Sequence, residues 1–124
     1  MRKNNYIALA KKASSIQINE LKKIKKVFNH SFVKAVDLIL NCKGKVIFAG
    51  VGKSGLIAKK ISATFSSVGI PSFFCDPAQA LHGDMGQIEK KDILIIFSYS
   101  GNTSELNNML KYANRFRIKV IGVA

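Results

Sequence analysis

The sequence predicts an α/β fold in which helices cover both faces of a parallel sheet, a three-layer sandwich. Short apolar runs, rich in β-branched residues, alternate along the chain with longer segments in which apolar residues recur at helical spacing. The short runs are apolar throughout, which is typical of parallel strands buried on both faces. A chain of 124 residues with 48% hydrophobic content is long enough to form one core of this kind.

The elements are expected in a regular order. Two helices come first, from about Asn5 to Asn29 and from Ser31 to Leu40, with Ser31 as the N-cap of the second. Beyond Gly44, which ends this helix, four strands and three helical segments are expected: strands 45–50, 71–75, 92–98 and 118–123, and helices 55–68, 77–81 and 103–114. We therefore predict a helical segment over residues 1–30 and an α/β domain over residues 31–124.

The net charge of +13 is concentrated near the N-terminus, because residues 1–45 hold eleven of the 20 lysines and arginines against only Glu20 and Asp37. Apolar residues alternate with these lysines at helical spacing: Ile16, Leu21, Ile24, Val27 and Phe28. This pattern predicts a basic amphipathic helix with a solvated lysine face. We expect no nucleic-acid partner, since no groove-reading element accompanies the charge.

No apolar run approaches the roughly 18–20 residues that span a bilayer, and no signal peptide is visible, so no membrane partner is expected. Cys42 and Cys75 are the two cysteines and lack the C-x-x-C spacing of a zinc site. These features predict a cytoplasmic protein with reduced cysteines.

A turn rich in hydroxyl groups follows the apolar run 93–97 and reads Ser98-Tyr99-Ser100-Gly101-Asn102-Thr103-Ser104. A helix begins near Thr103, so hydroxyl groups and unpaired backbone N–H groups converge where a helix N-terminus favours an anion. We predict phosphate binding here. The alternative, that Thr103 is only an N-cap, accounts for one hydroxyl and leaves Ser98 and Ser100 unexplained.

A glycine-rich turn, Gly50-Val51-Gly52-Lys53-Ser54-Gly55, follows the first strand. Its glycines allow close backbone approach and Lys53 supplies a cation. The turn is not a P-loop, because position 47 is Ile where that motif has Gly. The spacing of the three glycines also fits a dinucleotide-binding fingerprint, with Asp76 near the place of its acidic partner. This alternative is disfavoured by the hydroxyl-rich second turn.

The two turns and the segment between them resemble the SIS (sugar isomerase) domain and, within that superfamily, the arabinose-5-phosphate isomerases. The matching motifs are G-K-S-G at 52–55, P-S-F-F at 71–74, P-A-Q-A-L-H-G-D at 77–84 and the serine-rich stretch 98–105. The resemblance runs from about Ser31 to Ala124. It implies a flavodoxin-like sheet and conversion of D-ribulose 5-phosphate to D-arabinose 5-phosphate, at the head of 3-deoxy-manno-octulosonate and lipopolysaccharide synthesis.

The resemblance also implies roles for single residues. Isomerisation moves a proton between C1 and C2 through an enediolate and needs acid–base groups. Lys53 and Glu105 match the catalytic lysine and the first of two catalytic glutamates, although an acid is also favoured at the start of a helix by the helix dipole. The implied substrate-binding residues are Ser54, His82, Ser98, Ser100, Gly101 and Thr103. No cofactor and no metal ion are expected; Asp76 stands where relatives have a histidine suspected of binding zinc.

The final apolar run, 118–123, lies at the end of the sequence, whereas relatives continue with at least one further strand and with a second glutamate and a histidine. We therefore expect a SIS domain that is incomplete at its C-terminus and impaired as an isomerase. The alternative is a sugar-phosphate-binding SIS module without catalysis. Relatives form tetramers, so a homo-oligomer is expected.

Overall fold

A computed structural model describes residues 3–124 of the chain. Tertiary contacts divide the chain into two units, one ending at Val36 and the other covering Asp37–Ala124. The division after residue 30 that the sequence suggests stays a prediction. No helix among the described residues has an apolar stretch long enough to cross a bilayer.

The first unit is helical and contains α1 (Lys3–Lys23), the 3₁₀ turn η1 (Ile24–Val27) and the start of α2 (His30–Leu40). The single helix expected over 5–29 is therefore too long, because the α-helical hydrogen bonding ends at Lys23. The expected N-cap at Ser31 is wrong as well. Asn29 caps α2, and its side-chain Oδ1 accepts hydrogen bonds from the N–H groups of Ser31 (2.9 Å) and Phe32 (3.4 Å).

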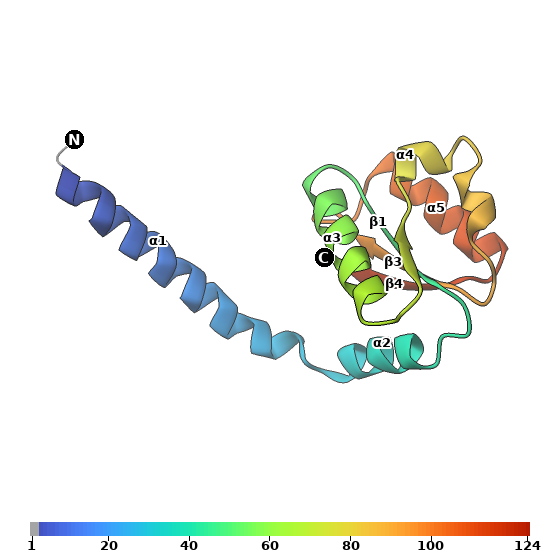
Figure 1. The fold of residues 1–124 in the computed structure, drawn as a ribbon, viewed down its shortest axis with the longest axis horizontal. Helices are drawn as coiled ribbons and strands as arrows, with labels where there is room; N and C mark the ends of the chain where they lie inside the picture. The colour runs from blue at the N-terminus through green and yellow to red at the C-terminus, as the bar shows by residue number, and fades with distance from the viewer. Residues whose placement is uncertain (1–2) are drawn as a thin grey trace. The chain divides into compact units, whose positions relative to one another are not determined.

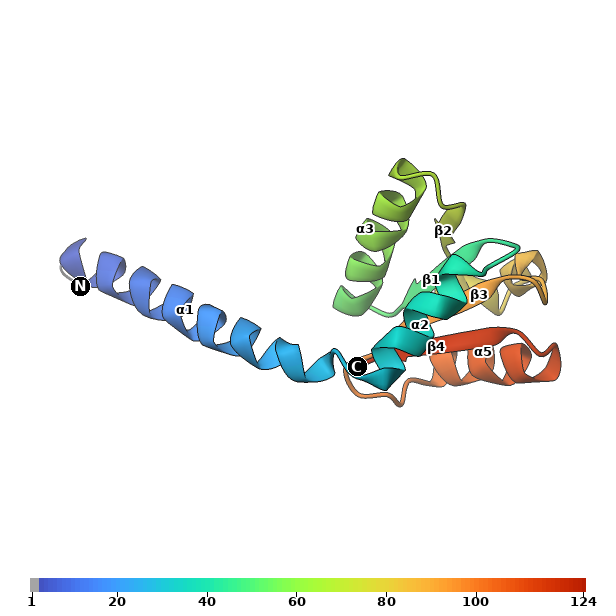
Figure 2. The ribbon, with the colours of Figure 1, turned by 90° about the horizontal axis from the view of Figure 1, so that it is seen from below.

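The second unit contains a sheet of four parallel strands, which confirms the α/β prediction. The strands are β1 (Val46–Gly50), β2 (Ser72–Phe74), β3 (Ile93–Phe97) and β4 (Lys119–Val123). Their order in the sheet is β2-β1-β3-β4. Figure 1 labels β1, β3 and β4, and Figure 2 labels all four strands. The chain moves outward from β1 to β2 and then returns to the other side of β1 for β3. The direction of winding thus reverses between β1 and β3, where open α/β sheets usually bind ligands.

Helices cover both faces of this sheet, which confirms the three-layer prediction. Figure 2 shows α3 (Lys53–Ser67) and α5 (Ser104–Arg115) on opposite sides of the strands. Two short helical turns, α4 (Pro77–Ala80) and η2 (Asp84–Gln87), lie between β2 and β3 in the sequence.

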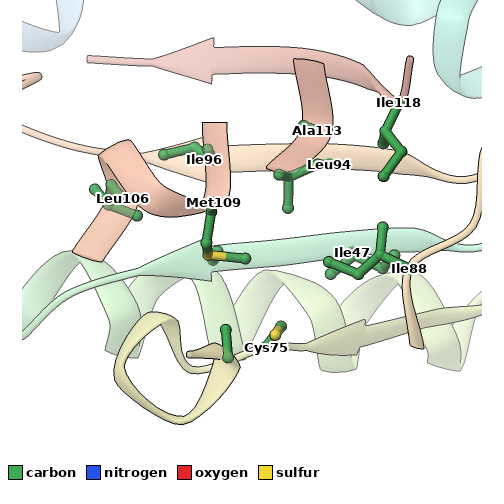
Figure 3. Packing of buried hydrophobic residues seen from close by; sticks show 11 residues of the cluster. Ile47, Cys75, Ile88, Leu94, Ile96, Leu106, Met109, Ala113 and Ile118 are labelled. Carbon is green, nitrogen blue, oxygen red and sulfur yellow. The ribbon is translucent and has the colours of Figure 1, made fainter. Parts of the chain in front are cut away.

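Each face of the sheet has its own buried apolar cluster, because successive strand residues point to opposite sides. On the α5 face, residues of β1 and β3 pack against Leu106, Met109 and Ala113 of α5 (Figure 3). On the α3 face, Phe48 of β1 packs edge-to-face against Phe65, with ring centroids 5.0 Å apart. The sheet is therefore fixed between two helices that both begin at the carboxyl ends of its strands.

Two glycines bring the start of α3 against the end of β1. A Cβ added to Gly55 would lie 2.5 Å from the carbonyl oxygen of Gly50, so no larger residue fits without a shift. Gly52, between them, has a φ of 60° and a ψ of −127°, a combination that only glycine adopts readily. The glycine spacing noted in the sequence thus serves a tight strand-to-helix turn.

Candidate functional site

A pocket of about 220 Å³ lies at the carboxyl ends of β1 and β3. Gly50 and Phe97 are direct partners in the ladder, so the two strands end level and the turns that follow them face one another. The residues that line the pocket are Val51, Ser54, Phe97, Ser98, Tyr99, Ser100, Thr103 and Leu106. Four of the hydroxyl side chains singled out in the sequence, from two separate turns, therefore surround one space at the point where the winding reverses.

Hydrogen bonds within the serine-rich turn leave the hydroxyl protons of Ser98 and Ser100 available. The Ser98 Oγ accepts a hydrogen bond from the Gly101 N–H (2.8 Å), and the Ser100 Oγ accepts one from the Asn102 N–H (3.4 Å). A hydroxyl that accepts in this way still has one O–H to donate. Gly101 has a φ of 70°, which lets the turn reverse so that its N–H reaches Ser98.

Thr103 occupies the N-cap position of α5 but makes no side-chain capping hydrogen bond. The helix therefore does not use the Thr103 hydroxyl, which instead lines the pocket. This observation weakens the interpretation of Thr103 as a cap alone. The Thr103 hydroxyl and the serine hydroxyls together provide a set of donors suited to the oxygens of an anion.

The local charge also favours an anion. Both α3 and α5 begin immediately after the turns that line the pocket, and a helix N-terminus carries partial positive charge and unpaired N–H groups. Lys53 is the first residue of α3, is exposed, and forms no ion pair within residues 3–124. No acidic side chain lines the pocket.

The remaining predicted site residues do not line this pocket. Lys53 is exposed beside Ser54, and Glu105 is half-buried in the first turn of α5, where its Oε2 accepts a hydrogen bond from the Ser104 hydroxyl (2.9 Å). His82 is exposed in the turn after α4. Gly101 lines an adjacent, mostly apolar pocket of about 280 Å³. The structure thus brings together Ser54, Ser98, Ser100 and Thr103, and the roles of all eight residues stay predictions.

Asp76 has a structural task. The Asp76 Oδ1 accepts hydrogen bonds from the N–H groups of Ala78 (2.8 Å) and Gln79 (3.4 Å), so Asp76 is the N-cap of α4. Among the described residues, no group of three or more His, Cys, Asp or Glu side chains is placed to hold a metal ion.

The residue before Asp76 is a buried cysteine. Burial raises the pKa of the Cys75 thiol to about 11, with further contributions from the negative charges of Asp84 and Asp76.

Sequence reasoning missed the apolar part of the pocket. Val51, Phe97 and Leu106 line it beside the hydroxyls, and Tyr99 stands at it with a side chain that is 97% exposed. The signal for Val51 and Phe97 was their place at the ends of two adjacent strands. An exposed aromatic ring at a pocket offers a flat apolar surface to part of a ligand other than its anionic group.

Comparison with known proteins gives a consistent result. The sequence model of the SIS domain matches residues 39–124. The chain is 41% identical over 122 residues to a Haemophilus influenzae protein named "Probable arabinose 5-phosphate isomerase", a match that covers 98% of this chain but 36% of that protein. It is 47% identical over 92 residues to the arabinose 5-phosphate isomerase GutQ of Escherichia coli K12, covering 74% of this chain and 29% of that protein. The chain thus spans about a third of the length of these relatives.

Solved structures show the same fold. A protein of Listeria monocytogenes superposes with a TM-score of 0.92 at 33% identity, over 98% of this chain and 64% of that one. A protein of Escherichia coli CFT073, solved in complex with arabinose 5-phosphate, superposes with a TM-score of 0.83 at 38% identity, over 98% of this chain and 65% of that one.

Proposed function

The chain belongs to the SIS domain family, and we propose that it is a sugar-phosphate isomerase domain of the arabinose-5-phosphate isomerase type. Its proposed reaction interconverts D-ribulose 5-phosphate and D-arabinose 5-phosphate. The observation that carries the proposal is the set of four hydroxyls, from Ser54, Ser98, Ser100 and Thr103, around one pocket at the carboxyl ends of β1 and β3.

In this proposal the hydroxyl pocket binds the phosphate group. Hydroxyl donors and two helix N-termini suit the phosphate oxygens without a carboxylate to repel them. The sugar then extends from the pocket past Tyr99, toward the starts of α3 and α5 where Lys53 and Glu105 lie. Binding the unreactive phosphate fixes the position of C1 and C2 relative to the acid–base groups, and such positioning accounts for a large share of catalysis.

The chemistry requires proton transfers only. A base removes a proton from C1 of the ketose, which gives an enediolate, and a proton is then delivered to C2 while the hydroxyl proton moves from the C1 oxygen to the C2 oxygen. Glu105 is proposed as the base, held by the hydrogen bond from Ser104 (2.9 Å). Lys53 is proposed to stabilise the enediolate with its ammonium group. No oxidant or reductant is consumed.

The test separates binding from turnover. D-arabinose 5-phosphate binding is measured by titration calorimetry, and turnover by coupled assay of D-ribulose 5-phosphate conversion. The double variant Ser98→Ala/Ser100→Ala should weaken binding at least tenfold, because each lost hydrogen bond to a charged group is worth about 1.5–3 kcal/mol. Ser14→Ala/Ser15→Ala removes the same two groups from exposed positions of α1 and should leave binding unchanged.

Glu105→Gln should reduce turnover by about 10²–10⁴-fold, the usual contribution of a general base, while binding persists. Lys53→Ala should reduce turnover by about 10²–10³-fold, the usual effect of losing one group that stabilises developing charge. If the wild-type chain shows no sugar-phosphate binding, or if the Ser98/Ser100 variant binds as tightly as the wild type, the proposal is wrong.

A second candidate is a sugar-phosphate-binding module without catalysis. The observation that favours it is that Lys53 and Glu105 do not line the pocket, whereas the hydroxyl set does. In that case the chain binds D-arabinose 5-phosphate, the Ser98/Ser100 variant loses binding, and turnover stays at the level of the Lys53→Ala variant.

The wider context belongs to the same proposal. The product would enter 3-deoxy-manno-octulosonate and lipopolysaccharide synthesis in the cytoplasm, a location in keeping with the free thiols of Cys42 and Cys75. The chain is proposed to act as a homo-oligomer, because the apolar side chains of α1 are exposed and call for a partner surface.

A further inference from the structure

A second polar pocket lies at the opposite edge of the sheet, at the amino ends of β1, β3 and β4. Its volume is about 160 Å³. Four lysines line it together with Asn41 and Cys42, which follow α2: Lys43 before β1, Lys90 and Lys91 before β3, and Lys119 at the start of β4. Because the strands are parallel, their amino ends all lie on the same side of the sheet. The full length of the strands therefore separates this pocket from the hydroxyl pocket at their carboxyl ends.

The charges around this lysine pocket do not cancel. Asp92, also in its lining, already accepts hydrogen bonds from the N–H groups of Lys45 and Glu89 (2.8 Å each) and pairs with the Lys45 Nζ at 3.3 Å. The Glu89 carboxylate is shared between Lys45 (3.6 Å) and Lys91 (3.2 Å).

Three lysines remain uncompensated: within residues 3–124, Lys43, Lys90 and Lys119 have no carboxylate in ion-pairing distance. They come from three segments distant in the sequence and line one hollow. Like charges brought together raise the free energy of the folded chain, and a multiply charged anion relieves that repulsion.

We propose that the lysine pocket is a second anion site, which binds a small phosphorylated ligand independently of the hydroxyl pocket. Each ammonium group offers three donors, which suits phosphate oxygens. The pocket volume of about 160 Å³ is many times the roughly 10–15 Å³ that holds one water molecule, so the hollow admits a phosphate or pyrophosphate group. Since the site is open to solvent, its affinity depends on ionic strength. Occupation would hold the segments before β1 and β3 against the start of β4.

Cys42 provides a local reporter for this site. It lines the lysine pocket and is half-buried, whereas Cys75 is 4% exposed elsewhere in the chain. The chain is treated with iodoacetamide at increasing concentrations of pyrophosphate, and the alkylation rate of each cysteine is read by peptide mass spectrometry. Bound pyrophosphate covers Cys42, so its rate should fall by the factor 1 + [L]/Kd, about tenfold at ten times Kd. The protection should weaken as salt is raised.

Variants assign the protection to the pocket. Lys43→Gln/Lys90→Gln/Lys119→Gln removes the three uncompensated charges and should abolish protection, whereas Lys59→Gln/Lys111→Gln, which removes exposed lysines from α3 and α5, should not. Ser98→Ala/Ser100→Ala disables the hydroxyl pocket and should leave Cys42 protection intact, which separates this inference from the proposed function. The inference is overturned if pyrophosphate leaves the Cys42 rate unchanged, if the triple variant is protected as well as the wild type, or if the Ser98/Ser100 variant loses protection.

Discussion

At the scale of single residues, Asp92 ties together the amino ends of β1 and β3. Its side chain is fully buried, and its carboxylate accepts the N–H groups of Lys45 and Glu89 while pairing with the Lys45 ammonium. Gly44 makes room for it, since a Cβ there would collide with the carboxylate. A buried acceptor with this many partners costs more to remove than an exposed ion pair, which is typically worth under about 1 kcal/mol.

We predict that Asp92→Ala lowers the free energy of unfolding by about 2–4 kcal/mol, because two backbone N–H groups and a partly buried ammonium lose their acceptor. Urea denaturation followed by circular dichroism measures the change. Asp37→Ala, which removes a carboxylate from α2 that takes part in no ion pair among the described residues, should change it by less than about 0.5 kcal/mol. Equal effects of the two substitutions would contradict the structural role given to Asp92.

The same carboxylate predicts a pH dependence of stability. Burial raises the pKa of Asp92, but the hydrogen bonds from Glu89 and Lys45 and the Lys45 charge outweigh it, and the net pKa is lowered. Because the pKa of Asp92 is lower in the folded chain than in the unfolded chain, the ionised carboxylate stabilises the fold. This stabilisation is complete at a pH above the pKa of an unfolded aspartate, about 3.9, and it is lost as the pH falls through the pKa of Asp92 in the folded chain. The stability difference between wild type and Asp92→Asn should thus be constant from about pH 7 to about pH 5 and shrink below about pH 4. Urea midpoints across this range test it; a difference that grows on acidification would show the opposite sign.

Cys75 should resist alkylation at neutral pH. Its thiol is buried, and its pKa of about 11 leaves almost no thiolate, the reactive form, at about pH 8. Iodoacetamide at that pH should therefore modify Cys42 much faster than Cys75 in the folded chain, and both at similar rates in urea. Equal rates in the folded chain would show that Cys75 is accessible.

At the scale of elements, the two strand-to-helix turns place the hydroxyl pocket. Gly55→Ala should lower the free energy of unfolding by about 1–3 kcal/mol, because its Cβ would press on the Gly50 carbonyl and displace the start of α3. Binding of D-arabinose 5-phosphate should weaken as well, since Ser54 moves with that turn. Gly122→Ala is the matched control, because a Cβ there meets nothing within 4 Å. Urea denaturation and calorimetry of both variants decide the point; a Gly55→Ala chain as stable as the control would refute the tight turn.

These elements also show how far sequence reasoning reaches. The runs over β1 and β3 were predictable because they are apolar without interruption, and only buried parallel strands combine that pattern with flanking helices. The end of α1 could not be predicted, because Ile24, Lys25 and Lys26 are ordinary helix residues and no local sequence signal ends the helix at Lys23. The N-cap of α2 was misplaced by two residues because Asn29 and Ser31 are both good caps.

The functional residues also include some that could be predicted from the sequence and some that could not. The hydroxyls of the pocket lie in contiguous motifs, so they could be selected from the sequence. The lysine pocket and Asp92 could not, because their partners meet only after folding: the hydrogen bond between Lys45 and Asp92 spans 47 positions. Spacing along a chain carries no information about such a contact until the strand order is known.

At the scale of the whole molecule, the N-terminal residues lack a core of their own. Every side chain described from Asn5 to Lys34 is exposed, and the large apolar residues among them include Ile16, Leu21 and Ile24, which line one hollow on the helix with Gln17 and Glu20. An apolar stripe of this extent is stable in water only when it is covered. We expect a second copy of the chain to cover this stripe.

We therefore predict a homo-oligomer that depends on one face of α1. Ile16→Asp should shift the mass in multi-angle light scattering toward the monomer, because it introduces a charge that must be desolvated in the interface. Ile18→Asp is the control: the residue type and the added charge are the same, and the exposed fractions match at 53%, but two helical positions rotate Ile18 to the lysine side, away from Ile16. It should leave the mass unchanged. A monomeric wild type, or an equal shift by both variants, would show that the stripe around Ile16 does not join two copies.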